Sequence, residues 1–145
     1  MNKIFKKICI ASDHAGYALK EKIKDHLVNK DISIIDLGPY NEDSVDYPDY
    51  AKKLAKRLIM KKSDSGILVC GSGAGMAITA NKFKGIRAVQ CYNKSSTIFS
   101  RQHNNSNVIC LGSRMLKYKD AFKYVTYFLN TKFEGGRHQK RINKI

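Results

Sequence analysis

The stretch that decides the fold reads GILVCGSGAG and spans residues 66–75. Its first half is a continuous apolar run, which is typical of a parallel strand covered on both faces. The run ends at Cys70 and passes directly into a glycine-rich turn, after which residues 76–81 are predicted to form a helix. A strand, a tight turn and a helix in this order indicate an α/β fold.

Four more apolar runs repeat this pattern, so five strands are predicted to alternate with helices. The predicted strands are residues 7–12, 32–36, 66–70, 87–91 and 108–112. Between them, three sets of apolar residues each share one helical face: Leu19, Ile23 and Leu27; Ala51, Leu54, Ala55 and Leu58; and Ala121, Tyr124, Val125 and Phe128. The sequence therefore predicts an α/β protein, a three-layer α/β/α sandwich around a five-stranded, parallel, Rossmann-like sheet.

Two helix starts carry recognisable signals. Pro48 is placed where the first turn of a helix tolerates proline, and Asn93, Ser95 or Ser96 can cap another helix.

The whole chain, residues 1–145, is predicted to be a single domain, because this length suits one core and is short for two. No apolar run reaches the roughly 20 residues that a membrane-spanning helix needs. The apolar start of the chain is cut short by Ser12, Asp13 and His14, unlike a signal peptide. We therefore expect a cytoplasmic protein with no membrane partner.

The chain is strongly basic, with 27 Lys and Arg against 12 Asp and Glu, a formal net charge of +15. Such a surplus favours an anionic partner, whether a nucleic acid, an anionic surface or a phosphorylated small molecule. The lysines are spread over every predicted helix without interleaved aromatics, so we expect most of them to be solvated and no nucleic acid to bind. The basic tail, residues 134–145, follows two glycines and could dock on a neighbouring surface.

The four cysteines form no CxxC pair. Cys9, Cys91 and Cys110 lie in predicted strands and are expected to be buried free thiols of a reducing compartment. Cys70 differs because the glycine-rich turn follows it at once.

Polar and reactive residues gather at one edge of the predicted sheet. Ligands of open parallel sheets bind beyond the carboxyl ends of the strands. At those ends the sequence places SDH (12–14), DLG (36–38), CGSG (70–73) and GSR (112–114). We therefore expect the functional site at this edge.

The glycine turn of residues 70–75 can point successive N–H groups at one spot beside a helix N-terminus, which suits a phosphate or a developing oxyanion. It is not a dinucleotide fingerprint, which would need glycine at Met76, nor a P-loop, which would need Gly-Lys-Ser/Thr. A tight turn with a purely structural purpose explains the glycines equally well.

Cys70 lies beside the same helix N-terminus, a setting that favours the thiolate form. A thiolate can act as a nucleophile or as a proton-abstracting base, with His103 and His14 as candidate partners. A Cys/His hydrolase is therefore an alternative, although no cysteine-protease signature surrounds Cys70. A metal site of Asp13, His14 and His103 is disfavoured because the histidines lack a paired spacing.

Arg137 and Arg141 lie four residues apart and would share one face of a helix, with His138 close by. Guanidinium groups suit phosphate oxygens. A solvated basic tail is the alternative interpretation.

Taken together, these segments resemble one family, ribose-5-phosphate isomerase B and its sugar-phosphate isomerase relatives. The matching segments are SDHAG (12–16), VDYP (45–48), CGSGAG (70–75), ANKF (80–83), GIRA (85–88), SRQHN (100–104), NV (107–108), LGSR (111–114) and EGGRH (134–138). They occur in family order along nearly the whole chain.

The resemblance implies that the chain interconverts ribose 5-phosphate and ribulose 5-phosphate through an enediolate, in the non-oxidative pentose phosphate pathway, without a metal or organic cofactor. On the matching positions, Cys70 would carry the proton between C1 and C2. The enediolate would be stabilised by the N–H groups of Gly71, Gly73, Ala74 and Gly75, with Ser72 assisting. One branch of the family has a glutamate just after the glycine loop; Met76 occupies that place here, so the chain resembles the cysteine branch.

The resemblance also implies the substrate contacts. His103 would open the furanose ring with the help of Asp13 and Tyr47, and Asn104 would hold a sugar hydroxyl. The phosphate would be bound by His14, Arg114, Arg137 and Arg141. Family members are homodimers or tetramers with active sites built from two subunits, so His103 and the tail could come from a partner.

Two alternatives stay open. Relatives with the same loop and base isomerise hexose 6-phosphates such as allose 6-phosphate or galactose 6-phosphate. A phosphosugar-binding module without turnover would also fit the fold and the charge, but it would not need Cys70 and His103.

Overall fold

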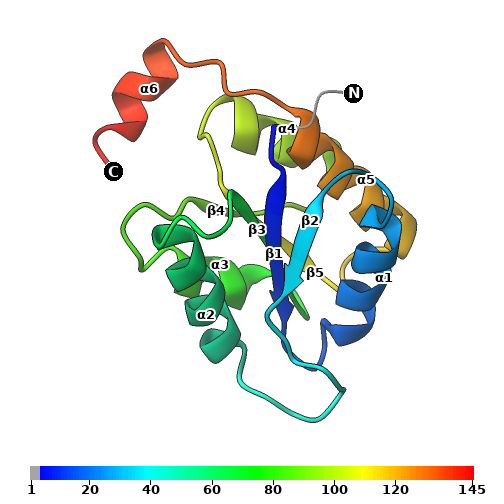
Figure 1. The fold of residues 1–145 in the computed structure, drawn as a ribbon. Helices are drawn as coiled ribbons and strands as arrows, with labels where there is room; N and C mark the ends of the chain where they lie inside the picture. The colour runs from blue at the N-terminus through cyan, green and yellow to red at the C-terminus, as the bar shows by residue number, and fades with distance from the viewer. Residues whose placement is uncertain (1–3) are drawn as a thin grey trace.

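The computed structural model describes residues 4–145, and residues 1–3 of the predicted domain lie outside the described residues. It contains one five-stranded parallel sheet (Figure 1). The strands are β1 (Lys7–Ser12), β2 (Ser33–Asp36), β3 (Ser65–Cys70), β4 (Ala88–Gln90) and β5 (Val108–Gly112). They lie in the order β2-β1-β3-β5-β4. All five predicted strands are confirmed, with bounds that differ by at most one residue at either end.

Helices cover both faces of the sheet, as predicted (Figure 1). They are α1 (Tyr17–Leu27), α2 (Tyr47–Ile59), α3 (Ala74–Ala80), α4 (Lys94–Gln102), α5 (Tyr118–Asn130) and α6 (Arg137–Ile142). The pair α2 and α3 packs on one face, whereas α1, α4 and α5 pack on the other. The three-layer α/β/α sandwich with a Rossmann-like sheet is therefore confirmed.

The core consists of two layers because successive strand residues point to opposite faces of the sheet. In β1, Ile8 and Ile10 pack towards α1 and α5, whereas Cys9 and Ala11 pack towards α2 and α3. The same alternation in β3 puts Cys70 on the side of α2 and α3. All the strand positions from 8 to 12, 65 to 70 and 108 to 112 are buried, which explains the continuous apolar runs.

Two predicted helix starts are confirmed and one is shifted. Pro48 lies in the first turn of α2, and the Asn93 side chain accepts the Ser96 N–H at 2.7 Å in a capping box at the start of α4. The helix after the glycine turn begins at Ala74, two residues before the predicted start, because Gly73 takes up the left-handed conformation and ends the turn earlier.

The strand order puts the ligand-binding edge at β1 and β3. The chain runs from β1 outwards to β2 and then returns to the other side of β1 to form β3, so the order reverses between these two neighbours. A crevice opens beyond the carboxyl ends of the strands at such a reversal. The lower end of the sheet in Figure 1 is this edge, and the loop of residues 37–46 projects beneath it between β2 and α2.

The basic tail contains α6, which projects from the opposite end of the sheet (Figure 1). Within residues 4–145, no helix combines the length and the apolar character needed to cross a membrane.

Candidate active site

The glycine turn after β3 folds back over the end of its own strand. Gly73 has φ +81°, a conformation that is costly for any residue with a Cβ, and its N–H lies 3.1 Å from the Cys70 sulfur. The Ala74 N–H donates to Ser72 Oγ at 3.2 Å. The thiol and the amides at the start of α3 are therefore held on one short turn.

A cavity of about 380 Å³ opens beside this turn. It is lined by Asp13, Tyr47, Cys70, Gly71, Ser72, Gly75, Arg114 and Met115. Cys70 thus borders this cavity as well as the core, although the residue is just 5 % exposed. Small residues in the turn are required by its neighbours: a Cβ at Gly75 would collide with the Tyr47 ring, and a Cβ at Gly71 would meet the Arg114 guanidinium at 2.9 Å.

The other three cysteines are buried thiols, as predicted. Cys9, Cys91 and Cys110 are at most 1 % exposed. Loss of hydration on burial raises the pKa of Cys9 and of Cys91 to about 11, and raises the pKa of Cys110 well above its ordinary value. Such thiols are inert as bases near neutral pH.

Asp13 and His14 follow β1 and are fixed by backbone contacts. The Gly16 N–H donates to Asp13 Oδ1 at 2.9 Å, and the Asp13 N–H donates to the Val69 carbonyl at 3.1 Å. His14 Nδ1 lies 3.1 Å from the Val45 nitrogen and 3.2 Å from the Val45 carbonyl oxygen, so the backbone of Val45 fixes the ring. Asp13 therefore faces the cavity from β1, and the loop of residues 37–46 holds the His14 ring.

Met76, at the position where the resemblance places a glutamate in another branch, is fully buried in the core between α3 and the sheet. It offers no base, which leaves Cys70 as the candidate base of the turn.

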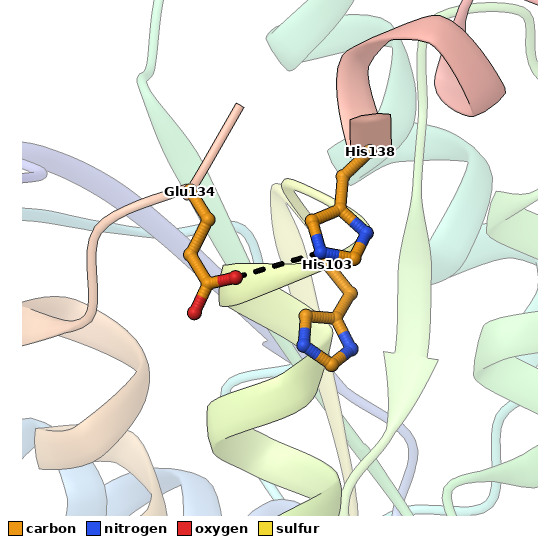
Figure 2. A group of neighbouring side chains, drawn as sticks. All are labelled: His103, Glu134 and His138. Atoms are coloured by element: carbon orange, nitrogen blue, oxygen red, sulfur yellow. Dashed lines mark ion pairs between the residues drawn. The ribbon is translucent and has the colours of Figure 1, made fainter. Parts of the chain in front are cut away.

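A second group of predicted site residues lies at the other end of the sheet. His103 caps the carboxyl end of α4, where its ring stacks on Phe99 and, on the other side, on His138 of α6, with a centroid separation of 4.3 Å (Figure 2). Figure 2 also shows Glu134, whose Oε2 lies 3.5 Å from His138 Nε2. That nitrogen is buried and has no hydrogen-bond partner. His103, Glu134 and His138 therefore form a compact group with unused polar capacity.

Buried Arg101 ties this end of α4 to the segment that leads into the tail. Its Nε donates to the Thr131 carbonyl at 3.1 Å, and its guanidinium lies over the rings of Phe5 and Phe128. Burial lowers the pKa of Arg101 to about 10, so it stays charged at neutral pH. Beyond it, the Glu134 N–H donates to the Gln102 carbonyl at 3.0 Å, which fixes the start of the tail beside α4.

The remaining predicted residues of this group are exposed. Asn104 follows His103 directly, and Arg137 and Arg141 both lie on α6, as their spacing predicted. The group therefore presents two guanidiniums, an amide and two imidazoles on one end of the molecule.

The structure does not bring the two groups together within one chain. Cys70 lies at the carboxyl end of β3, in register with Gly112, whereas His103 and Asn104 precede the amino end of β5. The length of β5 alone separates these edges by about 13 Å at about 3.3 Å per residue. His103 is therefore not a partner of Cys70 in the same chain, and the metal site considered for Asp13, His14 and His103 does not form within it.

A metal could be considered at His103, Glu134 and His138, the one group of this kind within residues 4–145, with donor atoms within 4.8 Å of one another. The two imidazole planes are only 12° apart and stacked, so an ion in the plane of one ring lies outside the plane of the other. Loss of hydration is the main cause that lowers the pKa of His138; the charges of His103 and Arg137 lower it further, and that of Glu134 raises it. The stacked geometry therefore does not suit a metal ion shared by the two rings.

Sequence reasoning missed Met115 and Glu134 as site residues. Met115 borders the cavity because it follows Arg114 in the turn after β5, a position that could have been inferred from the strand end. Glu134 lay within a matching segment but had no distinct chemical signal of its own.

The chain is similar to known proteins in sequence and in structure. The sequence model described as Ribose/Galactose Isomerase matches residues 8–145. The chain belongs to the ribose/galactose isomerase family. Ribose-5-phosphate isomerase B of Escherichia coli is 44 % identical over 140 residues, covering 97 % of this chain and 94 % of the relative.

Solved structures of family members have the same fold. A ribose 5-phosphate isomerase from Thermotoga maritima superposes with a TM-score of 0.94 at 49 % identity, covering 96 % of each chain. Ribose-5-phosphate isomerase B from Mycoplasma genitalium, solved with bound ribulose-5-phosphate, superposes with a TM-score of 0.89 at 45 % identity, covering 95 % of this chain and 92 % of the other. The resemblance inferred from the sequence segments is thereby confirmed.

Proposed function

We propose that this chain interconverts D-ribose 5-phosphate and D-ribulose 5-phosphate through an enediolate. The observation that carries the proposal is the turn itself: Cys70, Gly71, Ser72 and Gly75 border one cavity. Membership of the family and the ribulose-5-phosphate bound to the Mycoplasma genitalium relative support this substrate.

The turn supplies the two groups that the reaction requires. Removing a proton from the carbon beside a carbonyl needs a base and a stabiliser for the oxygen that becomes negative. Cys70 as a thiolate takes the proton from C2 of the open-chain aldose and returns it to C1 of the enediolate, while the hydroxyl proton of O2 passes to O1. N–H groups of residues 71–75 and the Ser72 hydroxyl stabilise the enediolate oxygen. The turn holds these donors close to the cavity, and the N–H groups of Gly73 and Ala74 pass from Cys70 Sγ and Ser72 Oγ to the enediolate as charge develops. One such donor contributes about 3–4 kcal/mol in acyl-transfer enzymes.

We further propose that a complete active site needs two copies of the chain, in a homodimer or a larger assembly. The cavity holds Cys70 and Asp13, whereas His103, Asn104 and the arginines of α6 lie at the other end of the molecule. In a twofold symmetric dimer, the His103 end of one copy can face the Cys70 edge of the other. The symmetry then forms two equivalent complete sites. In such a site His103 opens the furanose ring with Asp13 and Tyr47, and Asn104 holds a hydroxyl.

The phosphate in this proposal lies between Arg137 and Arg141 of one copy and His14 and Arg114 of the other. Guanidiniums one helical turn apart suit the oxygens of a phosphate. The net charge of +15 attracts an anionic substrate from solution. No metal or organic cofactor enters the proposed reaction.

A hexose 6-phosphate is the second candidate substrate, because the family description names galactose as well as ribose. The two candidates are distinguished by the ratio of kcat/KM for ribose 5-phosphate to that for allose 6-phosphate and galactose 6-phosphate.

The site of action that we propose is the cytoplasm, within the non-oxidative pentose phosphate pathway. The four unpaired thiols support a reducing compartment.

The test is a direct assay of the purified protein with ribose 5-phosphate in the presence of a chelator. We expect ribulose 5-phosphate to accumulate to an equilibrium mixture. A protein that binds the sugar phosphate without turnover would be a binding module, and release of product from ester or amide substrates with a trapped acyl-enzyme would indicate a hydrolase.

A further inference from the structure

Lys20 of α1 is a lysine whose side chain is fully buried. A buried ammonium is costly unless it is paired and hydrogen-bonded. Its Nζ lies 2.9 and 2.7 Å from the two carboxylate oxygens of Asp36, 2.8 Å from the Pro39 carbonyl and 3.1 Å from Glu21 Oε1. The contacts of Lys20 thus join α1 to the end of β2 and to the loop that follows β2.

This loop, residues 37–46, has no helix or strand of its own and is the segment that projects beneath the sheet in Figure 1. Its first residues are fixed around Lys20. The Gly38 N–H donates to Asp36 Oδ1 at 2.8 Å, and the Tyr40 hydroxyl donates to the Asp36 carbonyl at 3.1 Å. Lys20 also lies over the Tyr40 ring, 5.8 Å from its centroid. Without the ammonium, the Asp36 carboxylate and the Pro39 carbonyl would lose a shared donor.

The far end of the same loop holds residues of the cavity edge. Val45 contacts His14 through its N–H, and Tyr47, which follows the loop, forms one wall of the cavity and rests against Gly75. Near its start, the Gly38 carbonyl accepts the Ser12 N–H at 3.1 Å, directly before Asp13. The loop therefore joins the surroundings of Lys20 to His14 and Tyr47.

We propose that Lys20 is a positioning residue of the isomerase: it fixes the loop of residues 37–46 so that His14 and Tyr47 lie where substrate binds. This inference rests on the proposed function. The base and the amides of the turn belong to β3 and α3, whereas the hydrogen bonds of the Lys20 ammonium go to Asp36, Pro39 and Glu21. Loss of Lys20 therefore weakens substrate binding more than it slows the proton transfer.

The variant that tests this is Lys20→Met, which keeps most of the side-chain volume and removes the charge. We expect KM for ribose 5-phosphate to rise by about tenfold or more while kcat stays within about threefold of wild type. Should Lys20→Met not yield folded protein, the double variant Lys20→Met/Asp36→Asn takes its place with the same expectation. The added Asp36→Asn change leaves no unpaired charge and keeps an acceptor for the Gly38 N–H.

The chain offers a matched control on the same helix. Lys24 Nζ also lies 2.7 Å from Asp36 Oδ2, but its side chain is 29 % exposed, and its other ion pair is with Glu21 of α1 rather than with the loop. Lys24→Met therefore removes a cation from the same carboxylate and should leave KM within about twofold of wild type.

Hydrogen–deuterium exchange of the substrate-free protein gives a readout that does not depend on activity. We expect peptides covering residues 38–46 to exchange at least about tenfold faster in Lys20→Met, with unchanged exchange in residues 66–72. If the wild type does not isomerise ribose 5-phosphate but the loop still exchanges faster in Lys20→Met, the proposed function is overturned. The conclusion that Lys20 anchors the loop then still stands. Three results would each overturn the inference. They are an unchanged exchange rate of the loop in Lys20→Met, a fall in kcat at constant KM in that variant, and an equal rise in KM in Lys24→Met.

Discussion

Gly73→Ala is a substitution whose effect can be worked out from the turn. Gly73 has φ +81°, and a Cβ there would lie 3.0 Å from the Leu111 backbone carbon of β5. A left-handed alanine costs about 1–2 kcal/mol, and the contact adds about 1 kcal/mol because the backbone of a central strand cannot move aside. We therefore expect unfolding free energy to fall by about 2–3 kcal/mol, or about 7–10 °C in Tm for a chain of this length.

The same substitution should also lower the rate of turnover. Since β5 does not yield, the turn moves, and with it the Gly73 N–H that lies 3.1 Å from the Cys70 sulfur. Misplacing a donor of this kind typically lowers kcat by about 100-fold or more. Steady-state assays of the conversion of ribose 5-phosphate, together with thermal denaturation, measure both effects on the same sample.

Gly85→Ala is the matched control. Gly85 has φ +88°, but a Cβ there meets nothing within 4 Å, and the residue is not part of the cavity lining. It should lose about 1–2 kcal/mol of stability and keep a kcat near that of wild type. If Gly73→Ala keeps a normal kcat while its Tm falls, or if Gly85→Ala loses as much kcat, the turn does not stabilise the reaction as proposed.

Three further predictions concern the phosphate, the assembly and the acid limit of stability. Arg137→Ala should raise KM by about 10- to 100-fold with a smaller effect on kcat, whereas Gln139→Ala on another face of α6 should change neither; an unchanged KM for Arg137→Ala would mean a solvated tail. Equal amounts of inactive Cys70→Ala and His103→Ala chains, unfolded and refolded together, should recover about one quarter of wild-type activity. Half of the dimers are then mixed, and each mixed dimer has one complete site of its two. No recovery would argue against shared sites. Burial raises the pKa of Asp36, but the hydrogen bonds from Lys20 and Lys24 outweigh this effect and leave the pKa below its ordinary value. This carboxylate therefore stabilises the fold above about pH 4, and the stabilisation is lost as the pH falls through the lower pKa of the folded state. The Tm difference between wild type and Asp36→Asn should therefore be large at pH 7 and shrink at pH 3; a constant difference would contradict the pairing.

Much of the fold was predictable because the strands are buried on both faces. Continuous runs such as residues 66–70 and the shared faces of Leu54 and Leu58 reflect that burial directly. The strand order was not predictable, because hydrophobic patterns report burial and not neighbours: nothing local to residues 108–112 indicates that β5 inserts between β3 and β4.

The candidate site was predictable in its parts and less so in its arrangement. Cys70 and its glycines carry their own signal, since a reactive residue at a strand end lies on the ligand-binding edge. The position of His103 at the opposite edge follows from its place at the end of a helix before a strand, but its stacking on His138 needs the tertiary path of the tail. Lys20 differs from the expectation of solvated lysines, because its partners Asp36 and Pro39 lie on another segment.

The central claim, that the Cys70 thiolate moves the proton beside the glycine turn, is tested most directly by measuring turnover and substrate affinity of Cys70→Ala in parallel. The isomerase rate should fall nearly to background, while titration calorimetry with ribose 5-phosphate should give a Kd within about threefold of wild type, because the phosphate contacts lie elsewhere. Near-normal turnover in the folded variant would contradict the assignment of Cys70 as the base.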